Sequence, residues 1–169
     1  TCTSGRYRRK VIFPSFSEDG LLNYYVARSI DDVQRKYSNA DVKKTEIIFN
    51  EINIDWEKEL TVVEGPFDAI KCDTNTTCIL GSDLNIGSRL FTKIAKNKTR
   101  VLLALDSDMK EKTQSISKLL YEYGVDIRIL DTGNFSDVGE MTKREFQTRK
   151  QSAVVLNSDN YLLSRITRI

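Results

Sequence analysis

Acidic residues follow two apolar segments at the points where we expect β-strands to end. Glu64 comes directly after Leu60-Thr61-Val62-Val63, and Asp106 and Asp108 follow Val101-Leu102-Leu103-Ala104-Leu105. In an open parallel α/β sheet, ligands bind beyond the carboxyl ends of the strands, so these carboxylates should converge on one small volume. Their mutual repulsion calls for a cation, and carboxylate oxygens together with substrate phosphates suit Mg²⁺ or Mn²⁺. The spacing therefore indicates a divalent-metal site for phosphoryl chemistry.

The Asp-x-Asp pair and one later acid are the remaining candidate metal ligands. Alternate residues of an extended segment share a side, so Asp106 and Asp108 can hold one ion or a pair of ions. A competing interpretation makes Asp108 the N-cap of the next helix. Asp131 and Asp137 are both candidates for a further ligand, and we favour Asp137 because glycines on either side let its loop fold back.

Small residues mark the turns beside two of the predicted strand ends. Gly65 lets the backbone pass close to a ligand next to Glu64, which can bind metal or act as a general acid or base for a hydroxyl. Asp68 falls on the first turn of a helix, where it can act on a ligand or only favour the helix dipole. Gly81 and Ser82 follow another strand and either approach a phosphate or simply form a turn.

Two regions must position these residues. From Lys10 to Arg28, two apolar segments around Asp19-Gly20 predict a β-hairpin with Pro14 at an edge or bulge. From residue 60 onward, hydrophobic periodicity and helix caps predict strands and helices in alternation. We expect strands at 60–64, 77–81, 101–106 and 126–131, and helices near 66–73, 87–97, 110–123 and 139–152.

This pattern predicts an α/β fold in which a mostly parallel sheet flanked by helices is preceded by a small, basic, β-rich lobe. We divide the chain into the lobe at 1–58, the sheet domain at 59–153, and a C-terminal helix or tail at 154–169.

Composition excludes several classes of protein. The 169 residues are 40% hydrophobic, enough for a core, with no long apolar run and no secretory signal, so we expect a soluble cytoplasmic protein away from the membrane. Three cysteines without any histidine lack the pattern of a zinc site, and Cys72 and Cys78 should be reduced, core or near-core thiols. The net charge of +2 does not by itself indicate a nucleic-acid partner, but the basic residues cluster. The clusters are Arg6, Arg8, Arg9 and Lys10; Arg35, Lys36, Lys43 and Lys44; and Lys143, Arg144, Arg149, Lys150, Arg165 and Arg168.

The order of the acidic motifs resembles the Toprim metal-binding domain of DnaG-type primases, topoisomerases and related nucleases. The segment before it resembles the basic N-terminal lobe of a DnaG-type primase catalytic core, with the greatest likeness to bacteriophage primases. Together the likeness covers residues 8 to 149. The motifs that carry it are Glu64-Gly65 with Asp68, Leu80-Gly81-Ser82, Asp106-x-Asp108 and Asp137, preceded by Arg9 to Pro14, Tyr25 to Arg28, Arg35 to Asn39 and Ile48 to Asn50.

The resemblance implies roles for individual residues. Asp106, Asp108 and Asp137 would bind two or more Mg²⁺ or Mn²⁺ ions, joined by Glu64 through water. Glu64 would lie near the polymerising end, and Arg28 and Lys36 would be the catalytic basic residues that hold template or nucleotide phosphate. Further residues implied in nucleotide or DNA binding are Arg9, Lys10, Asn39, Gly65, Asp68, Gly81 and Ser82.

The implied function is a DNA primase that joins ribonucleoside triphosphates on a single-stranded DNA template, in the host cytoplasm if the protein is viral. The sequence departs from the family in lacking a zinc-binding module and a helicase Walker A motif, so we expect an excised core that works with a zinc module and a replicative helicase outside this chain. Val138-Gly139-Glu140 stands where bacterial relatives carry a proline followed by an acid. Two alternatives are a Toprim nuclease, in which the metal activates water, and a non-catalytic nucleic-acid-binding replisome module.

Overall fold

A computed structural model describes residues 3–81 and 83–157 of the chain. Its first part is an antiparallel hairpin of β1 (Lys10–Phe16) and β2 (Leu22–Ser29), with an irregular register between Ser15 and Phe16. Gly20 in the connecting turn has a φ of +78°, the left-handed conformation that glycine adopts without steric cost. Pro14 lies in β1, which pairs with β2 alone. The predicted hairpin is therefore confirmed.

The second part is a five-stranded sheet in the order β4-β3-β5-β6-β7. Its first four strands are parallel, and β7 runs antiparallel to β6. The strands span β3 (Leu60–Val63), β4 (Thr76–Cys78), β5 (Val101–Ala104), β6 (Ile127–Ile129) and β7 (Val154–Val155).

The mostly parallel sheet is confirmed, but three strands end two or three residues earlier than predicted: β4 at Cys78 rather than 81, β5 at Ala104 rather than 106, and β6 at Ile129 rather than 131. The expectation of a helix or tail from residue 154 is wrong for the first two residues, because Val154 and Val155 pair with Ile129 and Arg128. Leu156 and Asn157 belong to no helix or strand, and residues 158–169 of that predicted segment lie outside the described residues.

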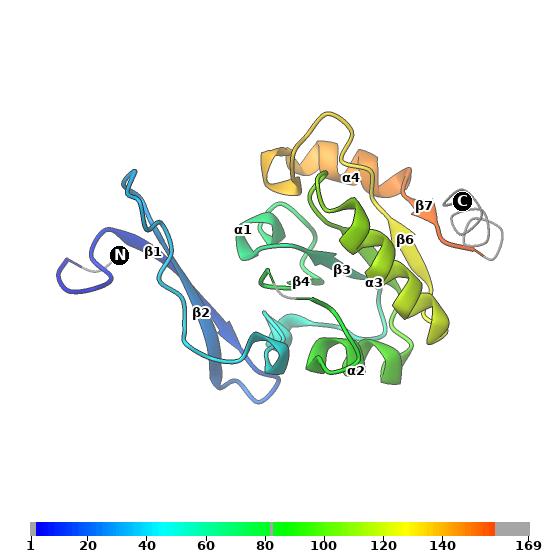
Figure 1. Ribbon diagram of the computed structural model, residues 1–169, viewed down its shortest axis with the longest axis horizontal. Helices are drawn as coiled ribbons and strands as arrows, with labels where there is room; N and C mark the ends of the chain where they lie inside the picture. Colours follow the sequence, from blue (N-terminus) through cyan, green and yellow to red (C-terminus); the bar gives the residue numbers. More distant parts are fainter. Residues whose placement is uncertain (1–2, 82, 158–169) are drawn as a thin grey trace.

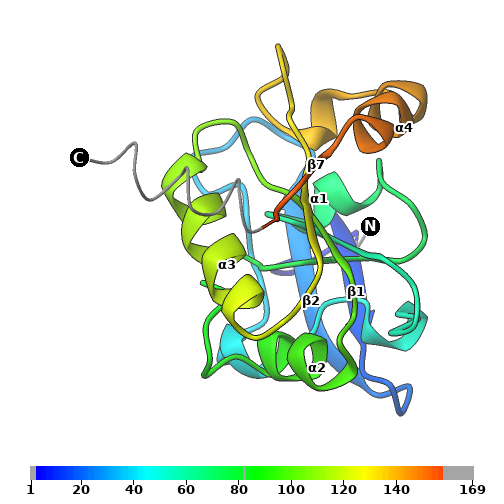
Figure 2. The same ribbon diagram turned by 90° about the vertical axis from the view of Figure 1, so that its right-hand side faces the viewer.

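Helices cover both faces of the sheet (Figures 1 and 2). In the two hydrophobic clusters, α2 and α3 pack on one face, whereas α1, α4 and the hairpin pack on the other. None of the described helices is long and apolar enough to cross a bilayer. The helices are α1 (Pro66–Ala69), α2 (Arg89–Asn97), α3 (Lys110–Glu122) and α4 (Lys143–Gln151), with 3-10 turns η1 (Lys44–Glu46), η2 (Glu51–Asn53) and η3 (Val138–Glu140).

Two helices are shorter than predicted because local hydrogen bonds close their ends. After α1, Cys72 N donates to Ala69 O at 3.3 Å, a tighter turn than the α-helical one. Before α4, residues 138 to 140 form η3, and Thr142 caps the helix by accepting a hydrogen bond from Glu145 N at 3.2 Å. The predicted stop of α3 is confirmed, since Gly124 beyond it has a φ of +71°.

The central strands β3 and β5 are buried on both faces. Every residue of each strand is buried, as expected for a parallel sheet with helices on both sides. Val62 and Leu103 pack into the cluster that includes α2 and α3, whereas Val63 and Leu102 pack into the cluster that includes α1 and α4. The ends of these strands are therefore held from both sides.

The hairpin is joined to the rest of the molecule by buried side chains and by an ion pair at its turn. Tyr24 and Val26 of β2 are buried in the same cluster as α1 and α4. At the other end, Glu18 in the hairpin turn forms a 2.6 Å ion pair with Lys93 of α2. These contacts fix the hairpin beside the sheet while leaving much of its surface exposed.

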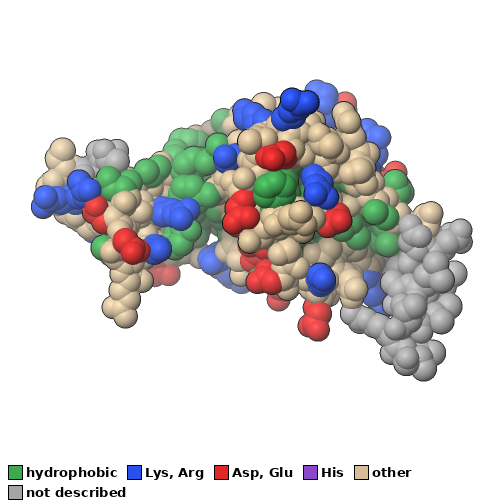
Figure 3. Space-filling model, turned by 90° about the horizontal axis from the view of Figure 1, so that it is seen from above, with side chains coloured by type: hydrophobic (Ala, Val, Ile, Leu, Met, Phe, Trp, Pro, Cys, Tyr) green, Lys and Arg blue, Asp and Glu red, His purple; other side chains and the backbone are tan. Residues whose placement is uncertain are grey.

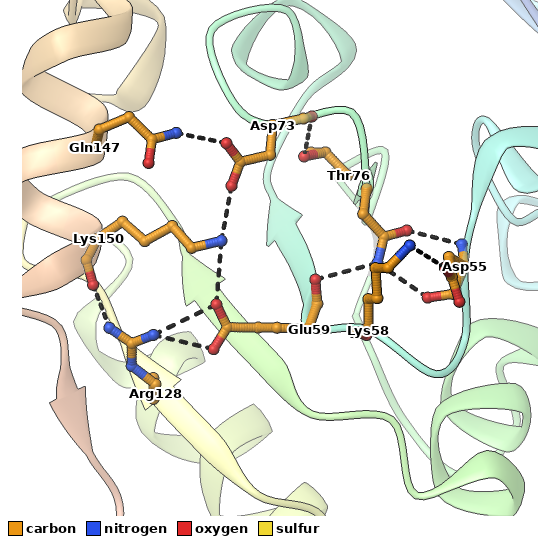
Figure 4. Close-up of polar contacts among 9 residues, drawn as sticks. Asp55, Lys58, Glu59, Asp73, Thr76, Arg128, Gln147 and Lys150 are labelled. Carbon is orange, nitrogen blue, oxygen red and sulfur yellow. Dashed lines mark hydrogen bonds and ion pairs between the residues drawn. The ribbon is translucent and has the colours of Figure 1, made fainter.

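A group of ion pairs fixes α4 to the sheet (Figure 4). Glu59, just before β3, pairs with Arg128 of β6 and Lys150 of α4, both at 3.1 Å. Lys150 also pairs with Asp73 at 2.7 Å, and Gln147 donates to the same carboxylate. The group therefore links four segments that are far apart in the sequence.

Cys72 and Cys78 are buried and unpaired. Burial raises the pKa of the Cys72 thiol to about 12 and also raises the pKa of Cys78. Both thiols are thus protonated at neutral pH, and the prediction of reduced core thiols is confirmed for them.

Candidate metal and nucleotide site

A cavity of about 480 Å³ lies between β2 of the hairpin and the carboxyl ends of β3, β4 and β5. One wall carries acidic residues from the sheet, and the opposite wall carries basic and aromatic residues from the hairpin and the segment that follows it. The lining residues are Tyr24, Val26, Arg28, Tyr37, Asn39, Glu64, Gly65, Pro66, Phe67, Asp68, Leu80, Gly81, Asp106 and Asp137.

Three acids that the sequence predicts as metal ligands, Glu64, Asp106 and Asp137, line this one cavity. Glu64 follows β3 directly, and Asp106 lies two residues beyond β5. Asp137 begins η3 and accepts a hydrogen bond from Glu140 N at 3.0 Å. The loops that carry the two aspartates are joined, because Ser107 N donates to the Ser136 carbonyl at 2.8 Å.

Asp68 completes the acidic wall. Its carboxylate accepts a hydrogen bond from Gly65 N at 2.9 Å, so it does cap its own helix. It also faces Asp137 across Gly139, where a β-carbon would stand 2.8 Å from Asp68 Oδ1 and 2.9 Å from Asp137 Oδ1. Only a residue without a side chain leaves room for both carboxylates here. Asp68 therefore caps its helix and also lines the cavity, whereas its direct action on a ligand stays a prediction.

Burial, together with the clustering of acids, raises the pKa of two of them, Asp106 and Asp68. Burial, followed by the charges of Asp68, Glu64, Asp137 and Asp108, raises the pKa of Asp106 to about 7. Burial also raises the pKa of Asp68, against the hydrogen bond from Gly65 N, with a further increase from the neighbouring acids. A cation placed among these groups would relieve the repulsion that keeps the protons on.

Lys112 of α3 is a residue of this site that the sequence analysis missed. Its Nζ lies 3.5 Å from Glu64 Oε1, and both side chains are about four-fifths buried, with 19% and 20% exposure. The other oxygen of Glu64, Oε2, is buried and has no hydrogen-bond partner. The two residues are 48 positions apart, so no local pattern could have indicated the contact.

Asp108 is placed differently from Asp106. It is exposed and does not line the cavity, although its charge contributes to the raised pKa of Asp106. The competing interpretation of Asp108 as an N-cap is wrong, because α3 begins after Met109 and has no side-chain cap. Asp131, the less favoured alternative to Asp137, instead accepts a hydrogen bond from Gly133 N within its own loop.

The acids are of a type that binds a divalent metal, although their side chains do not converge on a single coordination centre. Within residues 3–81 and 83–157, no three carboxylate or cysteine side chains have the spacing of a finished metal centre. Two observations nevertheless fit a cation: the unpartnered buried oxygen of Glu64 and the raised pKa of Asp106 amid four other carboxylates. Oxygen donors of this kind suit Mg²⁺ or Mn²⁺.

The opposite wall presents one arginine among aromatic rings. The Arg28 guanidinium of β2 lies 4.9 Å from the centre of the Phe67 ring and 5.7 Å from that of Tyr37. Its positive charge partly opposes the rise in the pKa of Asp68, so the two groups lie within electrostatic reach of each other. Asn39 also lines the cavity, and its buried Oδ1 has no hydrogen-bond partner.

The other predicted basic residues do not line the cavity. Arg9 forms a two-pronged ion pair with Asp31, with its shortest contact at 2.6 Å. Lys36 is exposed and pairs with Asp32 at 3.2 Å. Lys10 is the first residue of β1 and pairs with Ser29, the last residue of β2, at the open end of the hairpin.

The turn after β4 forms another part of the wall. Leu80 and Gly81 both have positive φ angles, +57° and +69°, and both line the cavity. This conformation is costly for leucine, and Lys44 Nζ supports it by donating to the Leu80 carbonyl at 2.8 Å. The prediction that Gly81 approaches the site is consistent with this placement, whereas Ser82 lies outside the described residues.

Comparison with known proteins identifies the fold. No protein-family model matches the sequence, and no curated protein matches it by sequence. Solved structures do match. The Aquifex aeolicus primase, comprising zinc-binding and RNA polymerase domains, has a TM-score of 0.73 at 22% identity over 90% of this chain and 42% of its own.

Two further solved structures agree. The DnaG primase catalytic domain bound to single-stranded DNA has a TM-score of 0.73 at 18% identity, over 95% of this chain and 56% of its own. The E. coli primase catalytic core has a TM-score of 0.68 at 18% identity, over 98% of this chain and 60% of its own. The chain thus spans about half the length of the chains it matches and has the fold of DnaG-type primase catalytic cores.

Proposed function

We propose that this chain is the catalytic core of a DNA primase that makes short RNA primers on single-stranded DNA, and that its sheet region is a Toprim domain. The observation that carries the proposal is the acid-lined cavity faced by Arg28, within a fold shared with primase cores. The likeness to bacteriophage primases remains a prediction from the sequence.

The acidic wall would hold two or more Mg²⁺ or Mn²⁺ ions through Asp106, Asp137 and Glu64. Asp108 can join them only if its side chain turns toward the cavity, because it does not line the cavity here. Bound divalent ions would neutralise the triphosphate and stabilise in-line attack by a ribose hydroxyl. Glu64 keeps one oxygen available for an ion or a hydroxyl proton, since its Oε2 has no hydrogen-bond partner.

The opposite wall would hold the substrate. Arg28 can grip a phosphate with two parallel hydrogen bonds, and its position over Phe67 keeps the guanidinium facing the acids. Lys36 is exposed on the adjoining segment and would reach template or nucleotide phosphate from the rim after leaving Asp32. The small residues Gly65 and Gly81 leave room for a phosphate near the backbone. Arg9 and Lys10 would contribute only to a longer DNA contact outside the cavity.

The partners follow from the same comparison. One matching DnaG catalytic domain was solved with single-stranded DNA, and another matching structure includes a zinc-binding domain. We extend both to this chain as proposals: a single-stranded DNA template, ribonucleoside triphosphates as substrates, and a zinc-binding module and replicative helicase on other polypeptide segments.

The test is a primer-synthesis assay with single-stranded DNA, labelled ribonucleotides and Mg²⁺ or Mn²⁺, comparing wild type with Asp106→Ala and Glu64→Gln. We expect metal-dependent oligoribonucleotides from wild type alone. Shortened DNA without RNA products would instead indicate a nuclease. DNA binding that is unchanged by EDTA, with no products even after a separately made zinc module is added, would indicate a non-catalytic module.

A further inference from the structure

A second groove, of about 480 Å³, lies between α4 and the loop that leads to Asp137. Figure 3, seen from the side of α4, shows Lys and Arg side chains gathered over this part of the surface. The groove shares this loop with the acid-lined cavity: Phe135 lines the groove, whereas Asp137 lines the cavity. Its lining residues are Phe135, Thr142, Arg144, Glu145, Thr148 and Arg149.

The guanidinium of Arg149 lies against Gly133. A β-carbon on Gly133 would collide with Arg149 Nη2 and stand 2.6 Å from Nη1. Gly133 also has a φ of +63°, which glycine adopts most readily. The loop therefore has a glycine at a position where a side chain would displace the arginine.

The two arginines of the groove have no acidic partner among the residues that the structure describes. No described carboxylate lies within ion-pair distance of Arg144 or Arg149, whereas the neighbouring Lys150 pairs with two acids. The carboxylate in the groove, Glu145, is occupied by the helix cap, where one of its oxygens accepts from the Thr142 N and Oγ1 atoms, both at 2.7 Å. The groove therefore presents two guanidinium groups that form no ion pair within the described part of the chain, against one carboxylate held by the helix cap.

The chemistry of the groove suits a phosphodiester chain. Arginine binds phosphate with a planar fork of donors, and two arginines can hold consecutive phosphates. Phe135 is half-buried in the same groove and can offer its ring to a base. A positive groove with an aromatic side chain is the usual combination for binding a single strand without sequence preference.

We propose that this groove binds the backbone of the single-stranded DNA template beside the acid-lined cavity, an inference that rests on the proposed function. A template must be held before any product strand exists, so its contacts are needed in the absence of RNA and metal. A duplex offers its phosphates but keeps its bases stacked, and it would leave the ring of Phe135 unused.

The test measures binding of fluorescent oligo(dT) by anisotropy over a salt series in EDTA, so that catalysis plays no part. The variant carries Arg144→Gln and Arg149→Gln, and the matched control carries Arg100→Gln and Lys118→Gln, two exposed cations of the α2 and α3 side. We expect the variant to bind about 10-fold more weakly, with a log-log salt slope shallower by about 1.4 for two lost phosphate contacts on a single strand. The control should bind like wild type.

A second variant tests the geometry without changing the charge. Gly133→Ala should displace the Arg149 guanidinium and weaken oligo(dT) binding several-fold, and circular dichroism would verify that it remains folded. Wild-type affinity in both the double variant and Gly133→Ala would overturn the proposal that the groove binds DNA, but it would not contradict the proposed function. An equal loss of affinity for a polyglutamate peptide would also overturn it, in favour of an acidic protein partner. Failure of the wild type to bind DNA at all would overturn both proposals.

Discussion

The sheet and the hairpin contribute to the same cavity in different ways. Asp106 follows β5, whose residues are all buried between two layers of helices, so the position of the acidic wall is set by the core. Arg28 lies on β2, where Arg28 and Leu22 are exposed. The strand packs against the core through the buried side chains of Tyr24 and Val26. The comparison teaches that the acidic side of the site depends on the folded sheet, whereas the side of Arg28 depends on the placement of one hairpin.

The largest expected effect tests whether the sheet alone carries the stability. Leu103→Ala, in the fully buried strand β5, should lower the free energy of unfolding by about 3 kcal/mol because it leaves a cavity in the core. Leu22→Ala, at a position of β2 that is 60% exposed, should change it by less than about 0.5 kcal/mol. Urea unfolding followed by circular dichroism measures both. Equal costs would mean that the hairpin is as much a part of the core as the sheet is.

The next prediction tests whether the spacing of the carboxylates in the acidic wall matters for activity. Gly139→Ala would place a β-carbon 2.8 Å from Asp68 Oδ1 and 2.9 Å from Asp137 Oδ1, pushing the two carboxylates apart. We expect metal-dependent primer synthesis to fall by about 100-fold, the usual result of misplacing reacting groups by about 1 Å. Gly87→Ala, outside the cavity, is the matched control and should keep full activity. Undiminished metal binding and synthesis in Gly139→Ala would show that the spacing of these two acids is unimportant.

A pH-dependent effect tests the repulsion within the acidic wall. Because the folded protein raises the pKa of Asp106 from 3.8 to about 7, the folded state binds more protons than the unfolded state between these values. The stability of the metal-free protein should therefore fall as the pH rises through this window. In EDTA at pH 8, Asp106→Asn should be more stable than wild type by about 2 kcal/mol, less than the full shift implies because the site is partly open to solvent.

The same experiment has an internal control. The advantage of Asp106→Asn should disappear below the ordinary pKa of an aspartate, where the wild-type group is protonated in both states. Adding Mg²⁺ at pH 8 should stabilise the wild type more than the variant, because the ion binds the carboxylate in the folded state. Thermal unfolding curves from pH 3 to 8 that run parallel for the two proteins would contradict the prediction.

The smallest effect concerns Lys112. Its ammonium group, 3.5 Å from Glu64 Oε1, repels any divalent ion that binds this carboxylate. Lys112→Met should therefore tighten Mn²⁺ binding several-fold, worth about 1 kcal/mol, as measured by titration calorimetry. Lys118→Met is the matched control on the same helix, where the lysine pairs with the exposed Glu122. Weaker Mn²⁺ binding in Lys112→Met alone would mean that the lysine instead holds Glu64 in its metal-binding position.

Features that depend on local periodicity could be predicted from the sequence. The strands that precede Glu64 and Asp106 are short, mainly apolar runs rich in valine and leucine, and parallel topology then brings their ends to one edge of the sheet. The hairpin turn at Gly20 and the end of α3 at Gly124 follow from the backbone preference of glycine. Most of the cavity lining on the sheet side follows from these elements.

Features that depend on where a strand stops or on distant pairs could not be predicted. Asp106 and Asp108 were expected to share a side, but β5 ends at Ala104, so the pair lies in a turn and only Asp106 lines the cavity. The sequence also gives no sign that Arg9 pairs with Asp31, 22 positions away, and the prediction that Arg9 binds DNA stays a prediction. Neither strand ends nor long-range ion pairs leave a periodic signal in the sequence.

The ion pairs of Glu59 bear on the order in which the chain can assemble during synthesis. Glu59 leaves the ribosome before Arg128 and Lys150, so its carboxylate gains its first partner with β6 and its second only when α4 has emerged. Because α4 follows directly after the loop of Asp137, the last acid of the cavity is secured only when nearly all of the described chain is available. A nascent chain would therefore expose an incomplete acidic wall until α4 has emerged and packed on the sheet.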